Sequence, residues 1–218
     1  SRGHIANGAG ACAHPALRVT VSATTVRIGH SAVLRGRLRC GARAVTGASV
    51  SLEIAPAAGA GTTRSARIRT SPRGSFAYVL GAGPSRRIGV SYRAFSDDRA
   101  PSATASAMLL VRPSISLAIT PARTTNGHTI TFRGSVSGGH EPAGGLPLEV
   151  EYREGPRWMI YDTALARRGD GRFVYRYTFR RTTESITYTF RVAIAAGGVS
   201  GYPYEPAASP PRSVHVDP

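Results

Sequence analysis

The chain has 218 residues, enough for one large domain or two small ones, and its 28 basic against 12 acidic residues give a formal charge of +16. Hydrophobic residues make up 41% of the chain, which is enough for a packed core, but no apolar run is long enough to span a membrane and no coiled-coil heptad repeat occurs. All the basic residues are arginines spread over both halves, a pattern that supports nucleic-acid binding only weakly.

Residues 1–16 have the composition of an extended arm. The chain begins with serine rather than methionine, which we interpret as the result of a cleaved secretory leader. Its two cysteines, Cys12 and Cys40, predict one disulfide in an oxidising compartment, which would pin the arm to the strand that holds Cys40. The alternative is a metal site formed by His4, Cys12 and His14 if Cys12 is free.

Beyond the arm, apolar residues recur at every second position, the period of half-buried strands rather than helices. Phe173, Tyr175 and Tyr177, for example, alternate with Arg172 and Arg176. Clusters of Gly, Pro, Ser and Asp separate such segments, which is typical of an all-β sandwich. The predicted strands cover 17–22, 32–40, 49–55, 63–70, 75–80, 87–95, 105–112, 115–120, 129–136, 147–153, 157–166, 172–179, 185–195 and 212–216.

The two halves of the chain repeat one another at an offset of about 98 residues. This offset places Gly29-His30 on Gly127-His128 and Arg35-Gly36 on Arg133-Gly134. The second copy carries an insertion near 197–208. We therefore predict two tandem seven-stranded sandwich domains that follow the arm. The predicted units are the arm at 1–16, domain 1 at 17–112 and domain 2 at 113–218.

Each copy also has a recurring strand and hairpin motif. The first reads VTGASVSL at 45–52 and RGSFAY at 73–78, and the second has GDGRFVY at 169–175. These motifs resemble secreted bacterial Ig-like modules, in particular the actinobacterial-type carboxypeptidase-regulatory-like (prealbumin-like) repeats. The resemblance implies an immunoglobulin-like or transthyretin-like fold and a role as spacer, adhesin or assembly unit. It implies no shared catalytic residues.

Recognisable catalytic motifs are absent from the sequence: it has no Gly-x-Ser-x-Gly elbow, His-Glu-x-x-His motif or phosphate-binding loop. We therefore expect neither an enzyme nor a cofactor. Asp97-Asp98, with Glu141 in the matching region, offers few oxygen ligands for calcium. Arg168-Gly169-Asp170 is an RGD triplet at a predicted hairpin tip, either an adhesion motif or an ordinary turn in a chain rich in arginine and glycine.

Several aromatic residues are candidates for contacts between subunits. Trp158 begins the run Trp158–Tyr161, which is apolar on both faces of its predicted strand, so one face could meet another subunit while the alternative is a core position. The insertion carries tyrosines, which are enriched at interfaces. We also expect the arm to pack into a neighbouring subunit. The candidate subunit contacts are Ile5, His14, Trp158, Tyr161, Tyr202 and Tyr204.

Together these features predict a secreted, non-catalytic structural protein at the cell surface. It would be a subunit or spacer of an assembly such as a fibre or pilus-like filament, and its partners would be copies of itself or other surface proteins. The alternative is an adhesion module that binds an anionic glycan or cell-wall polymer, which we favour over nucleic acid as a partner. The candidate anion contacts are Arg67, Arg69, Arg176 and Arg180.

Overall fold

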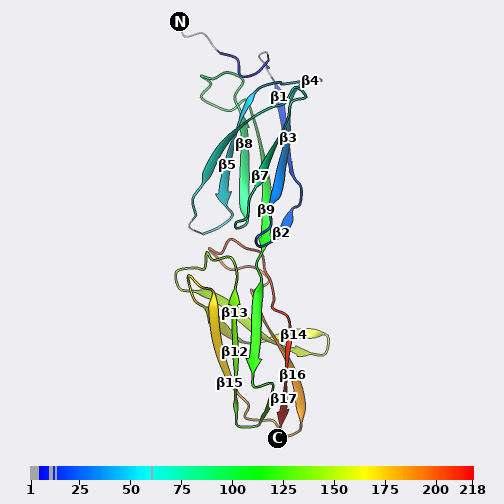
Figure 1. Cartoon of the computed structure of the whole chain (residues 1–218), viewed down its shortest axis with the longest axis vertical. Coiled ribbons are helices and arrows are strands. Elements are labelled where there is room, and N and C mark those ends of the chain that lie inside the picture. The colour runs from blue at the N-terminus through cyan, green and yellow to red at the C-terminus, as the bar shows by residue number, and fades with distance from the viewer. Residues whose placement is uncertain (1–4, 10–11, 13, 60) are drawn as a thin grey trace. The chain divides into compact units, whose positions relative to one another are not determined.

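The computed structural model describes residues 5–9, 12, 14–59 and 61–218. Within these residues the regular elements are all β-strands, so the all-β prediction is confirmed (Figure 1). The described residues include no helix long and apolar enough to span a membrane. The chain divides into two compact units, Ser1–Val111 and Arg112–Pro218.

The first domain contains a four-stranded and a five-stranded sheet. In the four-stranded sheet the central strand β3 pairs with β1, β7 and the short β4. These strands are β1 (Pro15–Val21), β3 (Ala32–Cys40), β4 (Arg43–Ala44) and β7 (Ser75–Leu80). The other sheet has the order β2 (Thr25–Arg27), β9 (Ala103–Arg112), β8 (Arg86–Tyr92), β5 (Ser49–Pro56) and β6 (Arg64–Arg69).

The second domain repeats this strand order. Its three-stranded sheet has the order β10 (Ile115–Thr120), β12 (Thr129–Val136) and β15 (Arg172–Thr178). Its five-stranded sheet has the order β11 (Arg123–Thr125), β17 (Arg212–Asp217), β16 (Ile186–Ala193), β13 (Leu146–Glu154) and β14 (Arg157–Ala166). Strand for strand, these sheets match the β1-β3-β7 and β2-β9-β8-β5-β6 sheets of the first domain.

The core of each domain consists of the alternate residues that point inward from both sheets. Leu34 and Leu38 of β3 have no exposed surface, and Leu52 of β5 has 2%. Ile130 and Phe132 fill the same place in the second domain. Each predicted strand overlaps an observed one. The sequence missed β2, β4 and β11 because two or three residues are too few to show a period of two.

A glycine that faces a phenylalanine across neighbouring strands recurs in both domains. Gly36 of β3 is paired with Phe76 of β7, and Gly134 of β12 with Phe173 of β15. A Cβ atom on Gly36 would lie 2.0 Å from the Phe76 ring, and one on Gly134 would lie 2.6 Å from the Phe173 ring. Each ring therefore fills the space of a missing side chain, an arrangement that supports a strand glycine.

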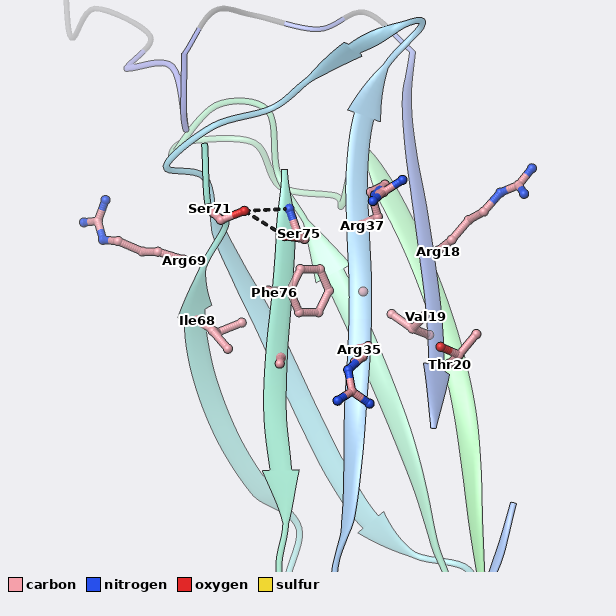
Figure 2. Close-up of a pocket in the computed structure, with 12 residues that line it drawn as sticks. Arg18, Val19, Thr20, Arg35, Arg37, Ile68, Arg69, Ser71, Ser75 and Phe76 are labelled. Atoms are coloured by element: carbon pink, nitrogen blue, oxygen red, sulfur yellow. Dashed lines mark hydrogen bonds between the residues drawn. The ribbon is translucent and has the colours of Figure 1, made fainter. Parts of the chain in front are cut away.

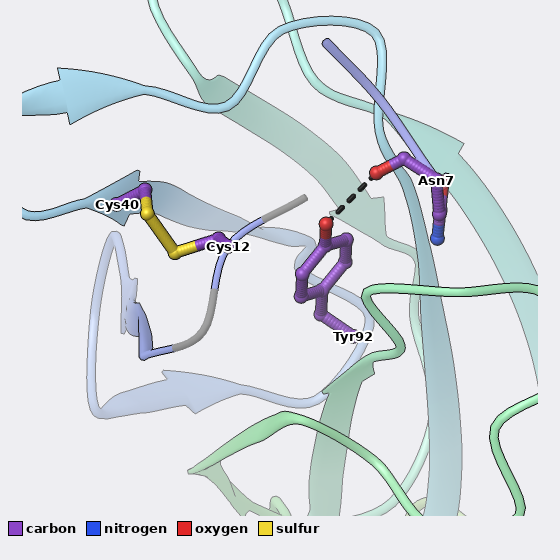
Figure 3. Close-up of a disulfide and its surroundings, with 4 residues drawn as sticks. All are labelled: Asn7, Cys12, Cys40 and Tyr92. Atoms are coloured by element: carbon purple, nitrogen blue, oxygen red, sulfur yellow. Dashed lines mark hydrogen bonds between the residues drawn. A yellow bond between two sulfur atoms is a disulfide. The ribbon is translucent and has the colours of Figure 1, made fainter. Parts of the chain in front are cut away.

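The arm is attached to its own domain. Cys12 and Cys40 form the predicted disulfide, so Cys12 is not available as a metal ligand (Figure 3). The Asn7 side chain accepts a hydrogen bond from the Ser49 N–H at 2.7 Å. The Tyr92 hydroxyl donates one to the Asn7 carbonyl at 2.8 Å (Figure 3). Residues 5–9 are thus ordered by contacts within the chain, and a neighbouring subunit is not needed to explain their position.

Candidate anion-binding site

The positive charge of the protein is concentrated in the first domain. Residues 1–111 contain 15 arginines and three carboxylates, whereas residues 112–218 contain 13 arginines and nine carboxylates. The arginines are spread almost evenly over the two domains. The asymmetry comes from the carboxylates, which are nearly absent from the first domain, so its arginines have few possible ion-pair partners.

Three of these arginines form a ladder along β3. Arg35, Arg37 and Arg39 alternate with residues that point into the core, and all three are exposed. Residues two apart on a strand lie about 6.6 Å from one another on the same face. Because β3 is the central strand of its sheet, this arginine ladder runs along the middle of the outer face.

The neighbouring strands add a fourth arginine and several small residues. Arg18 of β1 lies directly opposite Arg37, and Ser75 of β7 is opposite Arg37 on the other side. Arg35 has Thr20 and Ala77 as its two cross-strand neighbours. Small neighbours leave the arginines standing above the sheet.

This face forms a shallow groove, which we call the arginine groove (Figure 2). It is lined by Arg18, Val19, Thr20, Arg35, Gly36, Arg37, Ile68, Arg69, Ser71, Ser75, Phe76 and Ala77, a set without a carboxylate. The Arg69 side chain points away from Arg35 and Arg37 (Figure 2). The groove is therefore a cationic surface with no internal counter-charge.

Two like-charged residues, Arg18 and Arg37, occupy paired positions on neighbouring strands of the groove. Cross-strand neighbours such as Arg18 and Arg37 have Cβ atoms about 5 Å apart, and like charges in that position destabilise a sheet. Guanidinium groups hold five N–H donors in a planar fork that suits carboxylate, sulfate and phosphate oxygens. An anion bound between the two side chains would remove their repulsion. The arrangement thus favours anion binding over an empty groove.

Of the four predicted anion contacts, only Arg69 lines the groove, and the four are split between the domains. Arg67 and Arg69 are exposed on β6, at the edge of the other sheet of the first domain. Arg176 is exposed on β15 and Arg180 is exposed after this strand. The ladder was not among the predicted contacts, although the alternation of arginine with leucine and glycine within predicted strand 32–40 carries the signal.

The structure does not support Tyr202 and Tyr204 as contacts between subunits. They are only 4% and 5% exposed, and burial raises the pKa of Tyr202 above its usual value. The Tyr204 hydroxyl donates a hydrogen bond to the Gly138 carbonyl at 2.8 Å. The inserted segment folds back onto its own domain, and burial of these rings is the physical reason that the expectation fails.

The other candidate contacts remain at the surface. Ile5 is 70% exposed and His14 is exposed. Tyr161 is 43% exposed beside its own domain's Tyr177, and the Trp158 ring is half-buried, with the Arg191 guanidinium 4.3 Å from its centroid. These positions stay predicted contacts.

The RGD triplet is tied down by local bonds. Arg167 forms an ion pair with Asp170 at 2.5 Å, and the Arg172 N–H donates to the other Asp170 oxygen at 3.0 Å. The Arg172 N–H and the Arg167 charge hold the pKa of Asp170 below its usual value. The triplet thus lies in the turn between β14 and β15, where these bonds hold Asp170. Within the described part of the chain, no cluster of three His, Cys, Asp or Glu residues could hold a metal ion.

Comparisons with known proteins give similarity of fold only. Neither family models nor curated protein sequences match the chain. Among solved structures, it is similar to the adhesin InvE of Yersinia pseudotuberculosis, at 11% identity and a TM-score of 0.45 over 92% of this chain and 58% of that one. It is similar to a tetra-tandem repeat in the extending region of a large adhesion protein, at 13% identity and a TM-score of 0.45 over 92% of this chain and 48% of that one.

A third similar structure, alpha-2-macroglobulin of Escherichia coli, matches at 14% identity and a TM-score of 0.34, over 97% of this chain and 14% of that one. The chain thus spans less than two thirds of each of these three proteins. Matches at these identities and TM-scores carry no argument about function, which has to come from the surfaces of the chain itself.

Proposed function

We propose that this protein is a non-catalytic extracellular adhesion module that binds an anionic glycan or cell-wall polymer. The observation that carries the proposal is the arginine groove, where Arg18, Arg35 and Arg37 stand together with no carboxylate in the lining. A linear polyanion gains affinity from such a row because each neutralised charge releases counterions.

A polysaccharide fits the groove better than a nucleic acid. Proteins that hold single-stranded nucleic acid add aromatic side chains on which bases stack. The one aromatic residue of the groove, Phe76, is 6% exposed and lies against Gly36. The outer face thus offers charge and hydroxyl groups but no stacking platform.

The disulfide supports an extracellular location. Disulfides persist in oxidising compartments and are rare in the cytosol. The Cys12–Cys40 bridge joins the arm to β3, the strand that carries the ladder. Anionic polymers of the cell surface and matrix are present in the same compartment.

Binding to heparin, as a sulfated polysaccharide, tests the proposal. The probe is titrated into the full chain at several salt concentrations, with a single-stranded DNA oligonucleotide as second probe. If heparin neutralises four arginines, a plot of the logarithm of affinity against the logarithm of salt concentration should have a slope of about −3. The variant R35S/R37S removes two of these charges and should make the slope shallower by about 1.4.

The matched control is R176S/R180S, which removes the same charge from the second domain. It should leave the slope unchanged. An equal loss in both variants would show that only net charge matters. Tighter binding of DNA than of heparin would contradict the proposed glycan ligand and favour a nucleic acid.

The second candidate function is the assembly subunit or spacer, favoured by strand β14. This strand is an edge of its sheet and exposes Met159, Ile160 and Tyr161 by 39%, 61% and 43%. Exposed apolar edges can pair with another chain. Light scattering tests this candidate: fibres would support it, and a particle of 22.9 kDa, the mass of one chain, would exclude self-assembly.

A further inference from the structure

We propose a second anion site on the other sheet of the first domain: a pocket, closed on one side by the N-terminal arm, that takes a single sulfate or phosphate group. We call it the arm pocket. Its lining is Ile5, Ala6, Asn7, Gly8, Gly47, Ser49, Ser51, Arg67, Arg69, Arg93 and Ser96. Of these, only Arg69 also lines the arginine groove, so the inference does not depend on the function proposed for that groove.

The register of three strands brings the charges of the pocket together. Ser49 of β5 pairs with Arg69 of β6. The next residue of β5, Val50, pairs with Tyr92 of β8, so Arg93 follows on the opposite side of Ser49. Neighbouring strands are about 4.8 Å apart, which places the two arginine backbones about 10 Å apart with a serine between them. Two long cationic side chains can close over an anion in such a gap.

A second row deepens the site by one step along the strands. Ser51 pairs with Arg67 on one side and with Ser91 on the other. The pocket therefore contains three arginines and a floor of serine hydroxyl groups. Oxyanions accept hydrogen bonds from both kinds of donor. The nearest acidic residue on β5, Glu53, is one row further along and does not line the pocket.

The guanidinium groups of the pocket retain free donors. Arg69 uses one N–H group in a hydrogen bond to the Gly47 carbonyl at 3.3 Å. Arg67 and Arg93 take part in none of the ion pairs found among the described residues. Each guanidinium has five N–H donors, so most of them are left for a ligand.

The arm provides the remaining wall, and its position is fixed. The Asn7 side chain donates to the carbonyls of Ser49 and Arg93, both at 2.9 Å, and thus bridges β5 and the residue that follows β8. The Asn7 N–H donates to the Ala94 carbonyl at 2.8 Å, and the Ser96 N–H donates to the Ile5 carbonyl at 3.1 Å. The disulfide of Cys12 anchors the chain just beyond this segment. These bonds pre-form the site before any ligand arrives.

The size of the pocket restricts its ligand. Its volume is about 330 Å³, close to the lower end of the range for small-molecule sites. A sulfate or phosphate ester with one sugar ring would fit that volume, whereas the arginine groove is an open face suited to a linear polymer. In the 98-residue repeat, Glu149 occupies the place of Ser51, so the second domain puts a negative charge there.

Titration of inorganic sulfate and phosphate into the full chain tests the inference, with chloride at equal ionic strength as the reference and isothermal calorimetry as the readout. We expect saturable binding that R93S weakens at least tenfold, since it removes one charge-assisted contact. The control R87S removes an exposed arginine of β8 that lies outside the pocket lining, and it should bind as the wild type does. Equal loss in both variants, or no binding beyond that of chloride, would overturn the arm pocket.

Two further measurements identify the source of the anion and the role of the arm. Glucose 6-sulfate and glucose 6-phosphate are compared with the free ions: tighter binding of an ester assigns the pocket to a glycan substituent, and equal binding assigns it to the free ion. N7A, checked for folding by circular dichroism, should weaken binding at least threefold because it frees the wall. Unchanged binding by folded N7A would remove the arm from the site.

Discussion

The substitution Arg37→Ser should make the first domain more stable at low salt while weakening its hold on polyanions. Arg37 lies opposite Arg18 and between Arg35 and Arg39 on the same face of β3. Serine is the residue that the second domain has in this place, at Ser135. The substitution therefore removes three like-charge neighbours and puts in a residue that the same scaffold already holds.

Coulomb's law gives the magnitude. With the backbone spacings taken as charge separations, which sets an upper bound, like charges about 5.5 Å apart in water repel by about 0.8 kcal/mol, and each neighbour about 6.6 Å along the strand adds about 0.6 kcal/mol. The unscreened sum is about 2 kcal/mol, and the freedom of long side chains to move apart lowers it to about 1 kcal/mol. At 1 M salt the Debye length is about 3 Å, so little of the effect should remain.

Hydrogen exchange of the β3 amides measures this difference. A gain of about 1 kcal/mol slows exchange about fivefold at low salt when the strand exchanges through unfolding of its domain. The fluorescence of Trp158, which lies in the second domain, should show an unchanged unfolding transition. Arg87→Ser is the control, because Arg87 has Ala55 and Met108 as its cross-strand neighbours. Faster exchange, or a change that is equal at low and high salt, would refute the electrostatic reasoning.

Three other outcomes follow from the structure. Gly134→Ala should destabilise the second domain by about 1–3 kcal/mol in urea unfolding followed by tryptophan fluorescence, because the new Cβ would lie 1.9 Å from the Ser116 carbonyl oxygen. Replacing Cys12 and Cys40 by serine opens a loop with a sequence separation of 28 and should cost the first domain about 3–4 kcal/mol, measured by thermal unfolding. Asp162→Asn should flatten the fall in the second domain's stability at acid pH. The hydrogen bond from the Tyr175 hydroxyl lowers the pKa of Asp162 in the folded state. The stability from this bond is present above the pKa of the unfolded chain and is lost as pH falls through the pKa of the folded state, a loss that the variant cannot show.

The strands and the disulfide were predictable because each depends on a local or pairwise signal. Alternation of apolar and polar residues marks β3, β5 and β15 wherever the strand is long enough to show a period of two. Cys12 and Cys40 are the only cysteines, so their pairing had one solution once an oxidising compartment was assumed. These inferences require no knowledge of which segments lie side by side.

The candidate sites needed information that is not local. Arg67 and Arg69 could be predicted from one strand, but Arg93 joins them only through the register of β5 with β8. Tyr202 resembles an interface residue in composition, yet its segment folds back and buries the ring. Neither the partner strand nor the fold of a long insertion can be derived from a period of two.

The two domains show how one scaffold can carry different surfaces. They share the order of their strands. They also share core positions and the glycine–phenylalanine pair, which lie on the inward side of the strands. The outward residues differ: Arg18 and Arg37 in the first domain correspond to Ser116 and Ser135 in the second, whose hydroxyl groups lie 3.1 Å apart. Fold and binding surface therefore occupy alternate positions of the same strands. A substitution on the outer face can change binding without removing core contacts, so the variants proposed here test function separately from folding.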